Sequence, residues 1–266
     1  MTLTDSTAAA AGAPGAAVGL LATRGLTWKV GGVPIVDAVD LDLADGEFLA
    51  VIGPNGAGKT SLFNLISGLR RPTAGTVRLD GVDITRLSPH RRARRGLGRT
   101  FQSSSVFGSL SVAANVRLAV QAKRGGSMRP FSWPGRDRAV DARAAEVLAR
   151  VGLAGAGDRL AGTLAHGEKR KLEIALLLAG EPRVLLLDEP MAGVSAEDVP
   201  GLVTLIRSLT RDERRSVLMV EHHMDVVLDL ADRVAVMHHG ALLICDTPSA
   251  VMADRVVQEA YLGESL

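Results

Sequence analysis

Gly53-Pro54-Asn55-Gly56-Ala57-Gly58-Lys59-Thr60 fits the phosphate-binding template G-x-x-x-x-G-K-[ST] at every fixed position. The apolar run Phe48-Leu49-Ala50-Val51-Ile52 precedes this loop and predicts a buried strand. The residues that follow, up to Gly68, carry apolar side chains at the spacing of a buried helix face. A strand, a glycine-rich loop and a helix in this order are the context that the motif requires.

The residue types of this loop suit a chain of phosphates. Its glycines let the backbone curl so that its N–H groups point inward at a helix N-terminus, which already favours anions. Lys59 is placed to reach the β- and γ-phosphates, and the Thr60 hydroxyl is placed to hold Mg²⁺. The predicted nucleotide-binding residues here are Gly53, Pro54, Asn55, Gly56, Ala57, Gly58, Lys59, Thr60 and Ser61.

Length and composition exclude several classes of protein. A chain of 266 residues is long enough to bury a core, alone or with a lobe. Its 31 Lys and Arg against 29 Asp and Glu lack the basic excess of a dedicated nucleic-acid binder, so we expect no nucleic-acid partner. The single cysteine, Cys245, allows no intrachain disulfide and suits a reducing compartment. No apolar stretch reaches the roughly 18–20 residues of a membrane helix, which predicts that the chain does not span a bilayer.

Residues 1–18 are rich in Ala and Gly and show no period, so they are predicted to form a disordered tail. A signal peptide is the alternative, but no Lys or Arg precedes the stretch and Asp5 stands where positive charge belongs. Residues 19–266 are predicted to form the folded domain.

The rest of the chain predicts an α/β fold. Alternating segments at 26–30 and 39–43, which flank Gly31-Gly32, predict antiparallel strands, and a third such segment spans 75–81. Later, apolar runs separated by helical stretches predict strands that are buried on both faces of a doubly wound parallel sheet. These runs are 184–187, 217–220 and 234–237.

Two regions are predicted to be mainly helical. Residues of about 103–163 are poor in strand signals, and amphipathic helices are expected at 112–120 and 138–151. The end of the chain, 248–266, reads as a helical appendix.

The basic run 88–95 has two interpretations. It suits a phosphate or nucleic-acid patch, but Ser88 as a cap and Pro89 at the first helical position favour a short solvated helix.

Asp188 and Glu189 directly follow the apolar run 184–187. Side chains just past a buried parallel strand lie at the carboxyl edge of the sheet, where nucleotides bind. Asp188 is therefore predicted to bind the Mg²⁺ assembly, and Glu189 is predicted to polarise the attacking water.

In this combination the chain resembles the ATP-binding cassette ATPases over residues of about 20–266. The phosphate loop, Gln102, Leu164-Ala-His-Gly-Glu168, Asp188-Glu189 and His222 follow that family's order and approximate spacing. The resemblance implies a P-loop NTPase (RecA-like) core with a mostly parallel sheet, an N-terminal antiparallel β subdomain and an inserted α-helical subdomain. It also implies ATP and Mg²⁺ as cofactors.

The resemblance assigns roles to residues outside the phosphate loop. Gln102 would sense the γ-phosphate and its metal and couple them to the membrane partner, and His222 would contact the γ-phosphate. Ala165, Gly167 and Glu168 of the signature segment would face the ATP bound on an opposite subunit.

Finer details look like the ATP-binding subunits of branched-chain amino acid importers. The segments concerned are 98–102, 164–167, 172–175, 220–222 and 260–264. Urea and short-amide importers share much of this pattern, while the lipopolysaccharide-export ATPase usually has Leu-Pro-Gln near position 102 and a full Ser-Gly-Gly signature. The expected partners are permease subunits, a second ATPase subunit, identical or different, and a solute-binding protein. The expected location is peripheral, on the cytoplasmic face of the membrane.

Four positions depart from the family pattern. Ala165 lacks the usual Ser hydroxyl and His166 replaces the first glycine, although the Gly167 N–H remains. Val30 stands where an aromatic residue usually stacks on adenine; Trp28, on the same strand face, is either its replacement or a core residue. Ser195 stands where Asp is common.

Rival functions come from other classes. A nucleotide kinase should lack the signature at 164–175, and a DNA-associated cassette usually carries a coiled-coil insertion or a second cassette. A regulatory module that binds nucleotide without turnover stays open.

Overall fold

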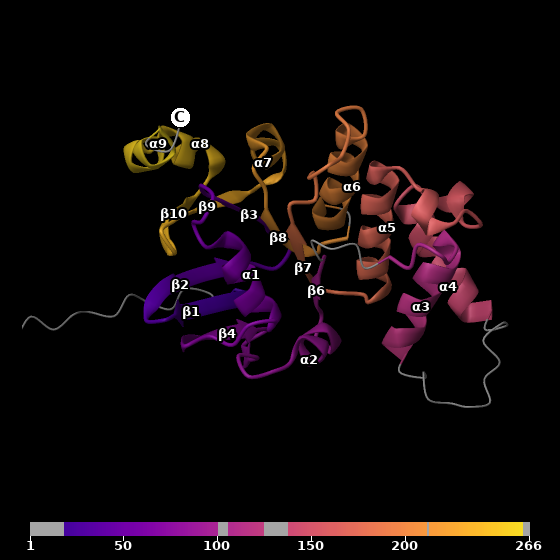
Figure 1. Cartoon of the computed structure of the whole chain (residues 1–266), viewed down its shortest axis with the longest axis horizontal. Helices are drawn as coiled ribbons and strands as arrows, with labels where there is room; N and C mark the ends of the chain where they lie inside the picture. The colour runs from indigo at the N-terminus through magenta and orange to yellow at the C-terminus, as the bar shows by residue number, and fades with distance from the viewer. Residues whose placement is uncertain (1–18, 101–105, 125–137, 212, 263–266) are drawn as a thin grey trace, which may run out of the picture.

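The computed structural model describes residues 19–100, 106–124, 138–211 and 213–262 (Figure 1). The predicted tail at 1–18 and the predicted site residue Gln102 lie outside the described residues.

A six-stranded sheet forms the centre of the molecule, with the strand order β10-β9-β3-β8-β7-β6. All neighbouring pairs are parallel except β9 and β10. Its strands are β3 (Phe48–Ile52), β6 (Leu97–Arg99), β7 (Val184–Asp188), β8 (Ser216–Val220), β9 (Arg233–His238) and β10 (Ala241–Asp246). Every residue of β3, β7 and β8 is buried, because helices or strands cover both faces of the sheet, as the apolar runs predict.

A four-stranded antiparallel sheet lies beside this core, in the order β2-β1-β4-β5. Its strands are β1 (Leu21–Val30), β2 (Val33–Leu43), β4 (Ala74–Leu79) and β5 (Val82–Asp83). Gly31 (φ 56°) and Gly32 (φ 86°) join β1 to β2, since a two-residue turn of this kind needs positive φ at both central residues. The predicted antiparallel sheet is confirmed.

Two apolar clusters cover the opposite faces of the central sheet. On one face, Val184 and Leu186 of β7 pack with α1 (Lys59–Ser67) and the antiparallel sheet. On the other face, Leu185 and Leu187 pack with the helical side of the molecule. The alternation along a single strand is the reason that the sheet is covered on both sides.

The helices on that second side lie together at one end of the molecule (Figure 1). They are α3 (Val112–Arg124), α4 (Arg138–Arg150) and α5 (His166–Ala179), with 3₁₀ turns at Ala154–Ala156 and Ala161–Thr163. α3 and α4 occupy the two segments predicted to be amphipathic helices, and their apolar stripes share one core with α6 (Val199–Arg211).

The C-terminal part lies at the opposite end, where α8 (Pro248–Ala253) and α9 (Arg255–Leu262) pack with α7 (Met224–Leu230) and β9 (Figure 1). Within the described ranges, no helix is both long and apolar enough to cross a membrane.

The basic run forms a short helix, α2 (Pro89–Arg94), that begins after Ser88 as predicted. The expectation that it is wholly solvated is wrong for Arg92, of which only 1% is exposed. The Arg92 guanidinium donates to the backbone carbonyls of Leu65, Ile66, Thr85 and Leu87. Leu65 and Ile66 belong to the last turn of α1, so Arg92 fastens α2 to the end of that helix.

Candidate nucleotide site

The phosphate loop joins β3 to α1, as its flanking sequence predicts. Gly53 has φ 148°, and a Cβ atom there would lie 2.1 Å from the Met237 carbonyl oxygen of β9. Gly58 has φ 96°, and its Cβ would lie 2.6 Å from the Ile35 carbonyl oxygen of β2. Only glycine fits both places, because the loop is squeezed between two strands and has positive φ.

Lys59 begins α1 and is only 6% exposed. Its Nζ donates to the carbonyl oxygens of Gly53 (2.6 Å) and Pro54 (2.8 Å), so the ammonium group lies against the inside of the loop. These two hydrogen bonds place a cation at the loop, where its charge would favour a bound phosphate.

The loop faces a hollow of about 240 Å³. Its lining consists of residues 55–61 together with Ile35, Glu189 and His222. The fold therefore brings two predicted catalytic side chains to the phosphate loop from far along the chain.

Glu189 and His222 follow β7 and β8, which are neighbours in the sheet. His222 Nε2 lies 3.0 Å from Glu189 Oε1, and the Glu189 N–H donates to the Val220 carbonyl oxygen at 2.9 Å. Glu189 has φ 46°, a left-handed conformation that costs a non-glycine residue about 1–3 kcal/mol. Strain of this kind concentrates at functional sites, and here it directs a carboxylate toward the hollow.

Asp188 ends β7 and has a fully buried side chain, 2.9 Å from Arg99 Nη2 through its Oδ2. Burial raises the pKa of Asp188, and the neighbouring Arg99 charge opposes that rise. Within the described part of the chain, Asp188 Oδ1 is buried without a hydrogen-bond partner. Thr60 lines the hollow, and Asp188 directly precedes the lining residue Glu189 without lining the hollow itself. The spare carboxylate oxygen and the Thr60 hydroxyl are hard oxygen ligands of the kind that Mg²⁺ takes in proteins, so the residue types fit the metal.

Comparison with known proteins agrees with this geometry. The family model described as ABC transporter matches residues 36–192. The chain belongs to the ABC transporter family. It is an ATPase cassette, and the predicted P-loop α/β fold is confirmed.

Similar proteins cover almost the whole chain. BraF of Pseudomonas aeruginosa, a high-affinity branched-chain amino acid transport ATP-binding protein, is 37% identical over 251 residues, 92% of this chain and 98% of its own. LivG of Salmonella typhimurium, which has the same description, is 38% identical over 252 residues, with the same shares. LptB of Acidithiobacillus ferridurans, a lipopolysaccharide export system ATP-binding protein, is 36% identical over 230 residues, 86% of this chain and 91% of its own.

The solved structure of the ADP conformation of MJ1267, an ATP-binding cassette of an ABC transporter, is also similar. It has a TM-score of 0.82 and 28% identity, and the match covers 92% of this chain and 99% of that one. The cassette accordingly binds nucleotide and drives transport, and its family implies a membrane permease and dimerisation.

The signature segment lies away from the hollow of its own cassette. Ala165, Gly167 and Glu168 stand at the N-terminus of α5, and none of them lines the hollow. Glu168 accepts from the Ala165 N–H at 3.1 Å and forms a bidentate pair with Arg159, at 2.6 and 3.0 Å. The Arg159 hydrogen bond holds the pKa of Glu168 below its ordinary value. Glu168 thus caps the signature helix of this cassette.

Position 167 favours glycine because Asp198 packs closely against it. A Cβ there would lie 2.7 Å from Asp198 Cγ, and Asp198 accepts a hydrogen bond from Ser195 Oγ at 2.8 Å. The Ser195 segment therefore packs directly on the signature.

Of the two residues considered for stacking on adenine, Val30 is exposed and Trp28 is partly buried against the core. The Arg70 guanidinium lies 5.6 Å from the Trp28 ring centroid. Neither Val30 nor Trp28 lines the hollow, and Ile35 of β2 does. This packing favours the core-residue interpretation of Trp28.

Sequence reasoning missed Arg99 and Ile35. Arg99 is a charged residue in the short strand β6, which pairs with the fully buried β7. A charged residue beside a buried strand is the sequence feature that could have indicated the buried ion pair with Asp188. No pattern in the sequence indicates that Ile35 approaches the phosphate loop.

Proposed function

We propose that this chain is the ATP-hydrolysing subunit of an importer for branched-chain amino acids, attached peripherally to the cytoplasmic face of the membrane. One observation carries the ATPase chemistry: the phosphate loop, Glu189 and His222 line a single hollow. The identity of the cargo rests on the similarity to BraF and LivG, which are branched-chain amino acid transport ATP-binding proteins.

In this mechanism the loop N–H groups and Lys59 bind the phosphates of ATP. Thr60 and Asp188 would hold Mg²⁺, which supplies neutralisation of the phosphate charge. Glu189 orients the attacking water, and His222, 3.0 Å from its Oε1, holds the carboxylate in place and contacts the γ-phosphate. Gln102 would sense the γ-phosphate and the metal. In this mechanism the rate of hydrolysis is raised by the positioning of the reacting groups and by stabilisation of the charge that develops on the phosphate.

A second cassette completes the site. Two cassettes close head to tail, so that the signature segment of each faces the ATP of the other, and hydrolysis reopens them. At the start of α5, Ala165 and His166 are exposed and Gly167 is buried within this cassette. The backbone N–H groups of this helix N-terminus would favour a γ-phosphate. The partner is a second ATPase subunit, identical or different.

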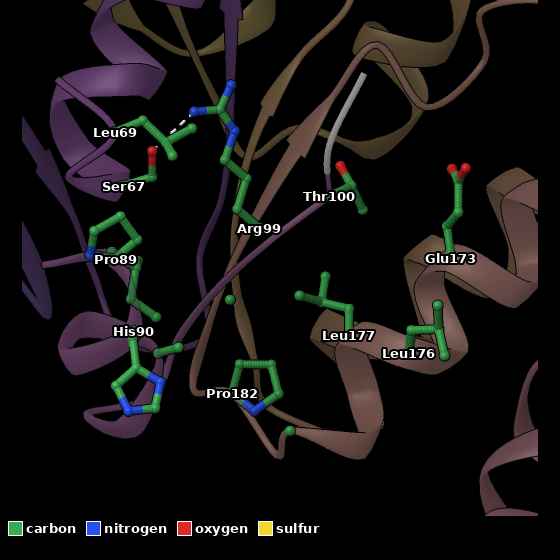
Figure 2. A pocket seen from close by; sticks show the side chains of 14 residues that line it. Ser67, Leu69, Pro89, His90, Arg99, Thr100, Glu173, Leu176, Leu177 and Pro182 are labelled. Carbon is green, nitrogen blue, oxygen red and sulfur yellow. Dashed lines mark hydrogen bonds between the residues drawn. The ribbon is translucent and has the colours of Figure 1, made fainter. Parts of the chain in front are cut away.

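A groove of about 380 Å³ is the proposed seat of a permease helix. Figure 2 shows its walls: Pro89 and His90 of α2 on one side, and Leu176 and Leu177 of α5 on the other. The lining is mostly apolar and includes Thr100, which precedes Gln102 by two positions in the sequence. A docked helix would thus lie between the nucleotide core and the helical side. The permease would in turn receive amino acids from a solute-binding protein.

Transport by the complex tests this proposal. The complex would be purified from its source membrane, its partners identified, and leucine uptake and ATP hydrolysis measured in proteoliposomes. We expect permease and solute-binding subunits to co-purify, and Lys59→Ala to abolish both activities. Lys29→Ala, an exposed lysine on β1, serves as the matched control. Hydrolysis without leucine uptake, or stimulation by a urea, amide or lipopolysaccharide cargo instead, would refute the branched-chain assignment.

A further inference from the structure

Arg99 connects three parts of the cassette through one buried guanidinium group. Its Nη2 lies 2.9 Å from Asp188 Oδ2, and its Nη1 donates to Asn64 Oδ1 and Ser67 Oγ, both at 2.8 Å. Asn64 and Ser67 belong to α1, the helix that the phosphate loop begins, whereas Asp188 ends β7. Only 7% of the Arg99 side chain and none of the Asp188 side chain is exposed.

The guanidinium is oriented by more than its charge. Its planar shape lets one nitrogen donate to α1 while another donates to β7. The Arg99 Cζ atom also lies 5.8 Å from the ring centroid of Phe63, a fully buried residue of α1. Because α1 and Phe63 are fixed by the core, Arg99 fixes the Asp188 carboxylate in turn. Oδ2 is occupied by Arg99, and the buried Oδ1 is left without a partner in the described part of the chain.

We propose that Arg99 is a positioning residue, which holds the Asp188 carboxylate so that Oδ1 is presented to the divalent cation of the nucleotide. The inference rests on the proposed function, in which Asp188 binds the Mg²⁺ assembly. Arg99 acts through Asp188 and does not line the nucleotide hollow, so its effect falls on the metal and spares metal-free nucleotide binding.

Arg99 also lines the proposed permease groove. Figure 2 shows its side chain extending from β6 past the groove toward Ser67 of α1, with the hydrogen bond drawn. Arg99 thus forms part of the groove wall and also contacts the phosphate-loop helix and the Asp188 carboxylate.

Metal binding to the purified cassette tests the proposal directly. Mn²⁺ would be titrated in the presence of ADP and followed by electron paramagnetic resonance, with ADP affinity in excess EDTA measured in parallel. In Arg99→Met we expect Mn²⁺ to bind about 10- to 100-fold more weakly, because removing a residue that orients a metal ligand has an effect of this size. ADP affinity without metal should equal that of the wild type. Arg95→Met, an exposed arginine at the end of α2, should change neither quantity.

Two further variants keep the test decisive if Arg99→Met does not fold. Arg99→Lys keeps the charge and loses the planar guanidinium group, so its Mn²⁺ affinity should lie between the affinities of Arg99→Met and the wild type. In an Asp188→Asn background, a change at Arg99 should cause no additional loss of Mn²⁺ binding, because its target is already gone.

Wild-type Mn²⁺ affinity in a folded Arg99 variant would overturn the proposal. The proposal would also fail if changing Arg99 weakened Mn²⁺ binding as much in the Asp188→Asn background as it does in the wild type. A wild-type cassette that binds neither ADP nor Mn²⁺ would refute the proposed function instead.

Discussion

At the residue scale, the backbone conformation of Glu189 determines where its carboxylate lies. Its left-handed backbone, with φ 46°, follows from a chain that leaves β7 and at once donates a hydrogen bond to the end of β8. The same geometry brings its carboxylate to 3.0 Å from His222. The strained backbone and the contact with His222 beside the phosphate loop together support the catalytic role proposed for Glu189.

Glu189→Gln is therefore expected to lower ATP turnover about 10²- to 10⁴-fold, since an amide cannot accept the proton of the attacking water. ATP binding should persist, because the substitution is isosteric and leaves the phosphate loop intact. Steady-state hydrolysis and equilibrium ATP binding check the two halves of this expectation. Glu146→Gln, which replaces an exposed carboxylate on α4, is the control. Turnover near the wild-type rate would remove Glu189 from its assigned role.

At the scale of elements, the junction of α1 and α2 depends on one buried cation. The Arg92 guanidinium donates to four backbone carbonyl groups. Burial lowers the pKa of Arg92 to about 10, so that it stays charged at neutral pH. The carbonyl oxygens at the end of α1 accept this charge favourably, since the helix dipole is negative there.

Arg92→Met should destabilise the protein by about 3 kcal/mol, because several buried carbonyl groups lose their donor. Arg91→Met, which changes the exposed neighbouring residue, should stay within about 0.5 kcal/mol of the wild type. Urea unfolding of the two variants measures the difference. Equal stabilities would mean that Arg92 does not hold α2 to α1.

The signature helix α5 has a stability contribution that depends on pH. Glu168 is a carboxylate whose pKa is lowered in the folded state, chiefly by its Arg159 hydrogen bond. Its contribution is therefore complete above its ordinary pKa of 4.5 and is lost as the pH falls through the lowered value.

Glu168→Ala should cost about 0.5–1 kcal/mol at pH 7, the range for an exposed ion pair at a helix N-terminus. The gap between wild type and variant should close as the pH falls below 4.5. Thermal melts across this pH range are the measurement. A gap of constant size down to acid pH would show that the Glu168 charge contributes nothing.

At the scale of the whole molecule, the proposed mechanism divides each ATP site between two cassettes. The phosphate loop lines one hollow, while Ala165, Gly167 and Glu168 lie at the start of α5, outside that hollow. Since the hollow lacks these three residues, the proposed complete site needs a second cassette.

Association should therefore depend on ATP. With ATP, the Glu189→Gln cassette is expected to form a dimer with itself or with a second ATPase subunit of the same transporter, because bound ATP is not consumed. Lys59→Ala should stay monomeric, since it lacks the cation that binds the phosphates. Light scattering after size-exclusion chromatography distinguishes the dimer from the 27.9 kDa monomer. Monomers under all these conditions would contradict the shared site.

Local patterns predicted much of this architecture. The phosphate loop, the strand before it and the helix after it were legible because their signals lie within a short window. The burial of Arg92 was not predicted, because a basic run looks the same on a solvated helix and on one that caps its neighbour.

The sequence by itself determined that this chain has a phosphate loop, a parallel sheet and a pair of acids at the end of a buried strand. Those features depend on residue types a few positions apart. Only the tertiary structure decided that His222 meets Glu189, that Ile35 borders the loop, and that Arg99 holds Asp188 against α1. These contacts join residues far apart in the chain, so they depend on strand order and on the packing of helices across the sheet.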